Sequence, residues 1–83
     1  MNDKEFINKA LEYSKMYEEM RAEGIIGLYY TDVHMEPDVF FNRFDKKQCK
    51  KSFHDSDYPT RYEIEKAGLR FFTITEEIYK KDK

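Results

Sequence analysis

The residues with the clearest catalytic potential partly resemble the acidic pattern of a class of nucleases. Asp38 follows Pro37, and Glu63-Ile64-Glu65-Lys66 stands further along the chain. In nucleases of this kind, paired acids hold a metal ion and a lysine polarises the phosphate. The second acid would stand two residues before Lys66, on the same face of a strand, but Ile64 occupies that position. Because Glu63 points to the opposite face, the pattern does not predict a nuclease.

A metal or thiol site is the second possibility. Its members would be His34, Cys49, His54, Asp55 and Asp57. Cys49 and His54 are five residues apart and lack the paired spacing of zinc ligands. No activating base or oxyanion donor is recognisable beside the thiol. The three glycines of the chain are too scattered to cradle a phosphate. We therefore expect a protein without catalytic residues, metal ligands or a cofactor.

The charges of the chain are unevenly distributed, and this distribution suggests where a partner binds. Residues 1–42 carry nine acidic and four basic side chains, whereas residues 43–54 carry five basic and one acidic, a local net charge of +4. The overall net charge of −2 argues against bulk attraction to nucleic acid or to an anionic membrane. The candidate partner-binding residues are Glu12, Glu18, Glu19, Glu23, Lys46, Lys47, Lys50, Lys51, Phe53 and Tyr58.

An amphipathic helix is predicted over residues 3–22. Phe6, Ala10, Tyr13, Tyr17 and Met20 recur at helical spacing, and Ile7 and Leu11 widen this apolar face. Asn2 followed by Glu5 resembles a capping box at the helix start. Gly24 is suited to a left-handed residue that ends the helix.

Residues 25–44 predict a hairpin and a short helix. Residues 25–30 and 33–35 are apolar and rich in β-branched and aromatic side chains, with a turn expected at Thr31-Asp32. A single strand across residues 26–35 is the alternative. Pro37 is typical of the first turn of a helix. Val39, Phe40, Phe41 and Phe44 make the following two turns strongly apolar, so this helix is expected to lie against the sheet.

The last part of the chain predicts a long charged loop and a second hairpin. Residues 45–57 are polar apart from Cys49 and Phe53, and we expect a loop there, with room for one helical turn. Residues 61–75 form the hairpin around Ala67-Gly68. A G1-bulge turn, the preferred alternative, brings Tyr62, Ile64, Phe72 and Ile74 to the core. A two-residue turn would instead bring Leu69 and Phe71 inward. Residues 76–83 are expected to be a charged tail with at most one frayed helical turn.

These elements predict one α+β domain over residues 1–83, in the order α-β-β-α-β-β. An antiparallel sheet of about four strands would have one face covered by the long and the short helix. The expected core is Phe6, Ala10, Leu11, Tyr17, Ile26, Leu28, Val33, Phe40, Phe44, Tyr62, Ile64, Phe72 and Ile74. One cysteine and no signal-peptide or membrane-spanning pattern indicate a reducing, cytoplasmic location.

The layout from residue 25 onward resembles small uncharacterised proteins of Gram-positive bacteria, their prophages and plasmids. The similar segments are Val33–Phe41, a hairpin leading into a Phe-rich helix, and the terminal hairpin from Tyr58-Pro59 to Gly68-Leu69-Arg70-Phe71-Phe72. The similarity covers about half the chain, and its motifs are structural. It implies a mobile-element context, in which small acidic proteins such as anti-CRISPR proteins bind and inhibit larger host proteins.

Two functions follow as expectations. The first is a non-enzymatic protein-binding factor of a phage or mobile element, an inhibitor of a host defence system such as CRISPR-Cas. Its seven Phe and seven Tyr exceed what a domain of this size readily buries, which favours an interface with a host protein or a second copy. The alternative is a nucleic-acid-binding regulator that uses the basic segment 43–54.

Overall fold

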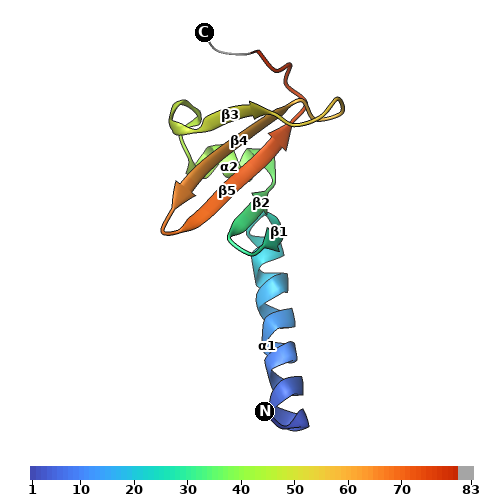
Figure 1. Cartoon of the computed structure of the whole chain (residues 1–83). Coiled ribbons are helices and arrows are strands. Elements are labelled where there is room, and N and C mark those ends of the chain that lie inside the picture. Colours follow the sequence, from blue (N-terminus) through green and yellow to red (C-terminus); the bar gives the residue numbers. More distant parts are fainter. Residues whose placement is uncertain (81–83) are drawn as a thin grey trace.

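The computed structural model describes residues 1–80, and it confirms the α+β class (Figure 1). Within these residues the chain forms two α-helices, a short 3-10 helix and five strands. The helices are α1 (Asp3–Ala22) and α2 (Pro37–Arg43), with the 3-10 helix η1 at Lys46–Gln48. The strands are β1 (Ile25–Tyr29), β2 (Asp32–Met35), β3 (Lys50–Phe53), β4 (Thr60–Lys66) and β5 (Leu69–Thr75).

The sheet is mixed, and in the described residues it has one strand more than expected. Its strand order is β1-β2-β5-β4-β3, so the two hairpins meet at the pair β2–β5, which is parallel. The other pairs are antiparallel. Both β1 and β3 are edge strands. The prediction of a purely antiparallel sheet was wrong because periodicity indicates a strand but not its non-local neighbour.

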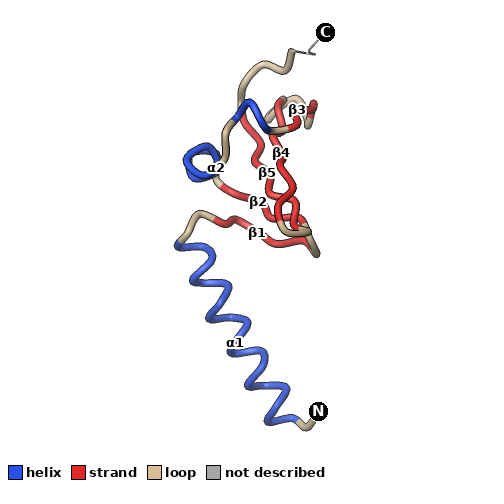
Figure 2. The backbone as a smooth tube through the Cα atoms, turned by 90° about the vertical axis from the view of Figure 1, so that its left-hand side faces the viewer, coloured by secondary structure: helices blue, strands red, loops and turns tan. Residues whose placement is uncertain are grey.

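The helix α1 has the expected bounds and an unexpected position. The Asn2 side chain accepts a hydrogen bond from the Glu5 backbone N–H at 2.8 Å, and Gly24 has φ +90° after the last turn. The helix does not cover the sheet, however, but projects from it (Figures 1 and 2). The molecule measures 56 × 27 × 21 Å, with a radius of gyration of 15.9 Å. A compact chain of this length would have a radius of about 12 Å.

The expected hairpin over residues 25–35 is present. Its two-residue loop is Tyr30-Thr31, one residue earlier than expected, because Tyr29 pairs with Asp32. The helix α2 begins at Pro37, as predicted, and packs on one face of the sheet. Phe41 contacts Tyr62 edge-on, with ring centroids 5.1 Å apart, and Phe44 lies 5.3 Å from Phe71.

The long loop predicted over residues 45–57 was wrong at residues 50–53, which form a strand, whereas the helical turn allowed for within it is present. Residues 46–48 form η1, and residues 50–53 form β3, which pairs with β4 from Lys50↔Glu63 to Phe53↔Thr60. This strand lacks an apolar alternation because it lies at an edge, where lysines are favoured and discourage pairing with other chains. A loop remains at residues 54–59.

The preferred register of the terminal hairpin was also wrong. Lys66 pairs directly with Leu69, so Ala67 and Gly68 form a two-residue turn with φ of 52° and 80°. Positive φ at both positions is the I′ type, whose twist matches that of the strands. The alternative register therefore holds. It places Phe71 opposite Ile64, on the α2 face, and moves Phe72 and Ile74 to the opposite face.

The core lies between α2 and the sheet. Its buried members are Val33, Met35, Phe40 and Tyr62, while Ile64, Leu69, Phe44 and Phe71 are half-buried against them. Phe72 is buried on the other face. The predicted core residues Phe6, Ala10, Leu11, Tyr17 and Leu28 are exposed, which corrects the expectation that α1 covers the sheet. Ile26 and Ile74 are half-buried, and the buried residue Met35 was not predicted.

The predicted C-terminal tail is described in part. Residues 76–80 form no helical turn, and residues 81–83 lie outside the described residues.

Candidate protein-binding surface

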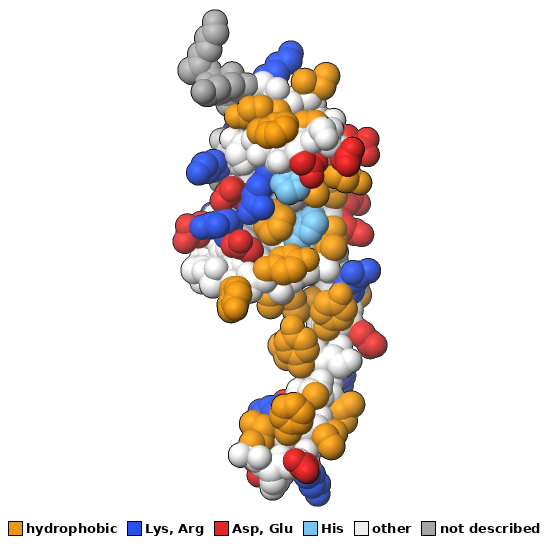
Figure 3. Space-filling model, turned by 45° about the vertical axis from the view of Figure 1, so that its right-hand side comes forward, with side chains coloured by type: hydrophobic (Ala, Val, Ile, Leu, Met, Phe, Trp, Pro, Cys, Tyr) orange, Lys and Arg blue, Asp and Glu red, His pale blue; other side chains and the backbone are white. Residues whose placement is uncertain are grey.

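The apolar side of α1 is the principal unexplained surface of the molecule. We name it the α1 stripe, formed by Phe6, Ile7, Ala10, Leu11, Tyr13, Met16, Tyr17 and Met20. None of the α1 residues is buried by the rest of residues 1–80, and Phe6 and Tyr13 are 66% and 65% exposed. Figure 3 shows apolar side chains gathered along the projecting helix. Exposed apolar surface of this extent, bordered by charges, is typical of an interface.

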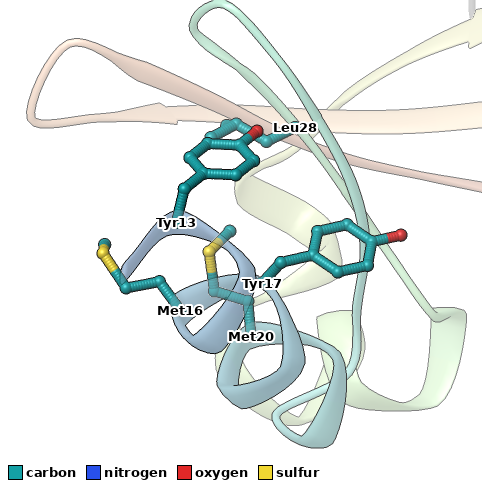
Figure 4. Close-up of a pocket in the computed structure, with 5 residues that line it drawn as sticks. All are labelled: Tyr13, Met16, Tyr17, Met20 and Leu28. Carbon is teal, nitrogen blue, oxygen red and sulfur yellow. The ribbon is translucent and has the colours of Figure 1, made fainter. Parts of the chain in front are cut away.

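A hollow lies where α1 meets the edge strand β1. Tyr13, Met16, Tyr17 and Met20 line it from the helix, and Leu28 lines it from the strand (Figure 4). Its volume of about 90 Å³ is well below the roughly 300–1,000 Å³ of small-molecule sites. Its lining is predominantly apolar, and two of its members are flexible methionines that adapt to different contacts. The hollow therefore suits an apolar side chain of a protein.

The four predicted acidic residues lie on α1 and immediately after it. Glu12 pairs with Lys9 at 3.7 Å, and Glu23 pairs with Arg43 at 3.4 Å. Glu19 and Glu23 also line a second, open depression together with Met16, Met20 and Ile25. Glu18 is exposed. The C-terminal half of α1 is thus an apolar surface with carboxylates beside it.

The predicted basic residues are not brought to one surface. Lys46, Lys47 and Lys51 line a depression with Asp45, Cys49 and Tyr62. The β3–β4 register places Lys50 on the opposite face of the strand from Lys51. Phe53 packs edge-on against Tyr79 at 6.0 Å. Tyr58 lies in the 54–59 loop, where its backbone N–H donates to Asp55 Oδ1 at 2.7 Å.

Lys46 has a role within the fold. Its Nζ donates to Glu77 Oε1 at 2.8 Å and lies 5.2 Å and 5.0 Å from the ring centroids of Phe41 and Tyr62. The Tyr62 hydroxyl donates to the other carboxylate oxygen of Glu77. These hydrogen bonds, that of Lys46 first, lower the pKa of Glu77, and the bond to Glu77 raises the pKa of Lys46. Burial is the main cause that raises the pKa of Tyr62.

The sheet face opposite α2 carries an ordered group that sequence reasoning missed. The Phe72 ring stacks on His34, with centroids 4.7 Å apart and planes within 8°, while the Arg61 guanidinium lies 3.8 Å from the Phe72 centroid. Glu63 accepts a hydrogen bond from Arg61 Nε and forms an ion pair with Arg70, each at 3.3 Å. Only the correct hairpin register, which places Phe72 on this face, would have revealed the group.

Cys49 and His54, the residues considered for a thiol site, have different neighbours. Burial, followed by the nearby Asp45 carboxylate, raises the pKa of the Cys49 thiol, which disfavours the reactive thiolate. Cys49 Sγ donates to the Asp45 carbonyl at 3.4 Å. His54 contacts Asp55 at 3.4 Å. Over residues 1–80, no three His, Cys, Asp or Glu side chains gather in a way that could hold a metal ion.

Comparison with known proteins adds no assignment, since no family model, no curated protein and no solved structure matches this chain. In the part of the chain that the structure describes, neither helix combines the length and the apolar character that crossing a bilayer requires.

Proposed function

We propose that this chain is a non-enzymatic protein-binding factor, and that the α1 stripe with Leu28 is its docking surface. The observation that carries the proposal is that a helix of 20 residues buries none of them within the described chain. An isolated helix is only marginally stable in water, and most helices in proteins are stabilised by packing of their apolar face. The proposal is that a bound protein supplies this packing for α1.

The size of the uncovered surface supports the same proposal. Phe6, Leu11 and Tyr13 are each more than 60% exposed, and Tyr17 is 44% exposed. Covering a large apolar side chain contributes about 1.5–3 kcal/mol. Aromatic residues and methionine are also enriched in interface centres. Several such contacts together are expected to offset the cost of association, which is on the order of 4–15 kcal/mol.

The charges beside the stripe define the kind of protein surface that fits it. Residues 12–23 carry Glu12, Glu18, Glu19 and Glu23 against Lys15 and Arg21, a net charge of −2. We therefore expect the bound surface to be apolar, with lysine or arginine at its border, because complementary charge speeds association and rejects wrong partners.

As part of this proposal we assign the chain to the accessory proteins of phages and mobile elements, as an inhibitor of a host defence system such as CRISPR-Cas. The support is the resemblance of residues 25–72 to proteins of prophages and plasmids, together with small size and a polarised charge distribution. It is an inference from likeness, and the docking surface does not depend on it.

A photo-crosslinking amino acid placed in the stripe tests the docking surface. We expect a variant with the crosslinker at Tyr13 to couple to protein in the cell, either a second copy or another protein. The matched variant at Lys15, on the opposite side of α1, is the control and should couple much less. Equal coupling at both positions, or none at Tyr13, would contradict the proposal.

A second candidate function is nucleic-acid binding through the depression that Lys46, Lys47 and Lys51 line beside Tyr62. Charge reversal at the exposed residue Lys47 (Lys47→Glu) would then weaken binding of single-stranded DNA or RNA and lower its salt dependence. Gel-shift titrations at low and high salt, with Lys15→Glu as the control, measure this. If the wild-type chain binds neither nucleic acid at low salt, this candidate is excluded.

A further inference from the structure

We infer that the occupant of the α1 stripe is a second copy of this chain, bound with its α1 antiparallel. Each N-terminal half of α1 then lies against the C-terminal half and Leu28 of the other copy. The inference rests on the proposed function, because it names the protein that the same surface docks. Three features of the molecule lead to it: the exposed area of the stripe, the position of the sheet relative to α1, and the side chains at the two ends of the helix.

The available area suits a two-fold interface. Among the described residues, seven large side chains of this surface are 41–66% exposed: Phe6, Ile7, Leu11, Tyr13, Met16, Tyr17 and Leu28. At roughly 100 Å² each, they offer on the order of 700 Å² per protomer. Stable interfaces bury about 800 Å² per partner. In a dimer with two-fold symmetry, one surface supplies both sides.

The position of the sheet favours the antiparallel orientation. The sheet is attached at the C-terminal end of α1, and the N-terminal half of the helix extends away from it (Figures 1 and 2). The helix is about 30 Å long. An antiparallel pair places the two sheets at opposite ends, whereas a parallel pair crowds them at the same end. Only the antiparallel pair brings an uncovered half into contact with the hollow of the other copy.

The side chains of the two halves are complementary. The hollow has a volume of about 90 Å³ and is lined by Tyr13, Met16, Tyr17, Met20 and Leu28. Phe6 and Ile7 are large and exposed, at the opposite end of the helix. In the antiparallel pair they enter the partner's hollow, where the thioethers of methionine make favourable contacts with an aromatic ring.

The helix dipoles support the same orientation, because an antiparallel pair aligns them favourably. The net charge of α1 does not distinguish the two orientations. Residues 3–12 carry Asp3, Glu5 and Glu12 against Lys4 and Lys9, and residues 13–23 carry Glu18, Glu19 and Glu23 against Lys15 and Arg21, a net of −1 in each half.

Sedimentation equilibrium tests the stoichiometry. We expect the full chain to sediment at twice its 10.2 kDa mass at micromolar concentrations. Tyr13→Glu and Met16→Lys should each raise the dimer dissociation constant at least about tenfold, whereas Lys15→Glu, on the opposite side of α1, should not. Because these positions lie outside the core, dispersed NMR signals of the sheet should confirm that each variant is folded.

Crosslinking tests the orientation. In a Cys49→Ser background, a short bis-maleimide reagent should join Phe6→Cys in one copy to Met20→Cys in another when the two variants are mixed. Met20→Cys alone should not crosslink to itself. Efficient Met20–Met20 coupling would overturn the antiparallel orientation.

The outcomes separate this inference from the proposed function. A wild-type chain that stays monomeric at high micromolar concentration overturns the dimer. If such a monomer still couples to another protein through the crosslinker at Tyr13, the docking surface stands with a different occupant. A monomer that couples to no protein overturns both the dimer and the docking surface.

Discussion

At the residue scale, His34, Phe72 and Arg61 form a stack on the sheet face opposite α2, which we call the open face. The three side chains come from β2, β5 and β4, so the stack connects the parallel pair to the terminal hairpin. Burial, then the charge of Arg61 and that of His54, lowers the pKa of His34 below 6.5. The folded chain therefore favours the neutral imidazole of His34 more strongly than the unfolded chain does. The stability that depends on a neutral His34 is fully present above pH 6.5 and is lost as the pH falls through the folded-state pKa.

The pKa of His34 should respond to its neighbours in the order of their influence. We expect Arg61→Gln to raise the pKa of His34 but leave it below 6.5, because burial is the largest cause and remains. His54→Gln should raise it less. NMR titration of the imidazole C–H protons measures both. A wild-type pKa at or above 6.5 would contradict this account of the open face.

Glu77 connects the end of the described chain to η1 and to the core. Its carboxylate accepts from Lys46 and from Tyr62, and its backbone carbonyl accepts from the Thr60 hydroxyl at 2.9 Å. Its folded-state pKa is lowered from 4.5. The carboxylate therefore contributes stability above pH 4.5, and the contribution disappears as the pH falls through the folded-state pKa.

We expect Glu77→Gln to destabilise the fold at neutral pH by roughly 1 kcal/mol, since the carboxylate is 44% exposed and its ion pair is screened by water. The difference from the wild-type chain should shrink as the pH falls below 4.5. Urea unfolding at neutral and acidic pH measures it. The neighbouring exposed residue provides the control, Glu76→Gln, which should show no such difference. An equal loss in the two variants would contradict the assigned role.

At the element scale, Gly24 determines how α1 leaves the sheet. It has φ +90°, is buried, and its carbonyl accepts from the Glu36 backbone N–H at 2.9 Å. A Cβ added there would lie 2.5–2.8 Å from three Val39 side-chain atoms. Gly68 has a similar φ of +80°, but a Cβ there would have no neighbour within 4 Å. The two glycines therefore separate backbone strain from steric overlap.

We expect Gly68→Ala to cost about 1–2 kcal/mol, the penalty of a left-handed conformation for a residue with a side chain. Gly24→Ala should cost about 1–3 kcal/mol more, because Val39 must also move. Urea unfolding at one protein concentration compares them. The double variant Gly24→Ala/Val39→Ala should lose less than the sum of the single variants. Equal costs for the two glycine variants would exclude the contact with Val39 as the reason for Gly24.

At the scale of the whole molecule, the sheet with α2 forms the packed unit, and none of the α1 residues is buried within the described chain. The sheet unit contains every buried residue of the described chain apart from Gly24, at the end of α1. An α1 without a partner would have only its own hydrogen bonds and a small contact with β1. Its stability is thus expected to be separate from that of the sheet.

Dilution should reveal this separation. If a second copy covers α1 as proposed, dilution will dissociate the dimer. We then expect backbone amides of α1 to exchange hydrogen faster, while those of β4 and β5 keep their protection. Hydrogen exchange followed by mass spectrometry, at several protein concentrations, measures both regions in one sample. Tyr13→Glu should show the unprotected α1 at all concentrations. Protection of α1 that does not change with dilution in the wild-type chain would contradict dependence on a second copy.

The sequence by itself determined the local elements. The bounds of α1, the left-handed Gly24, the β1–β2 hairpin and the Pro37 start of α2 all follow from preferences expressed within a few residues. The predicted acidic and basic residues could also be identified from the sequence as charged clusters. The sequence could not predict whether the lysines of residues 46–51 share a surface. That depends on the pairing of β3 with β4, which places Lys50 and Lys51 on opposite faces.

Only the tertiary structure decided what each element packs against. An amphipathic pattern states that α1 has an apolar face, but α2 already occupies the sheet face that it was expected to cover. The two-residue turn of the terminal hairpin placed Phe71 on the α2 face and Phe72 on the opposite face, the reverse of the preferred prediction. The parallel β2–β5 pair joins strands that are far apart in the chain. These outcomes depend on competition among distant surfaces, which no local pattern contains. The same competition left the α1 stripe uncovered.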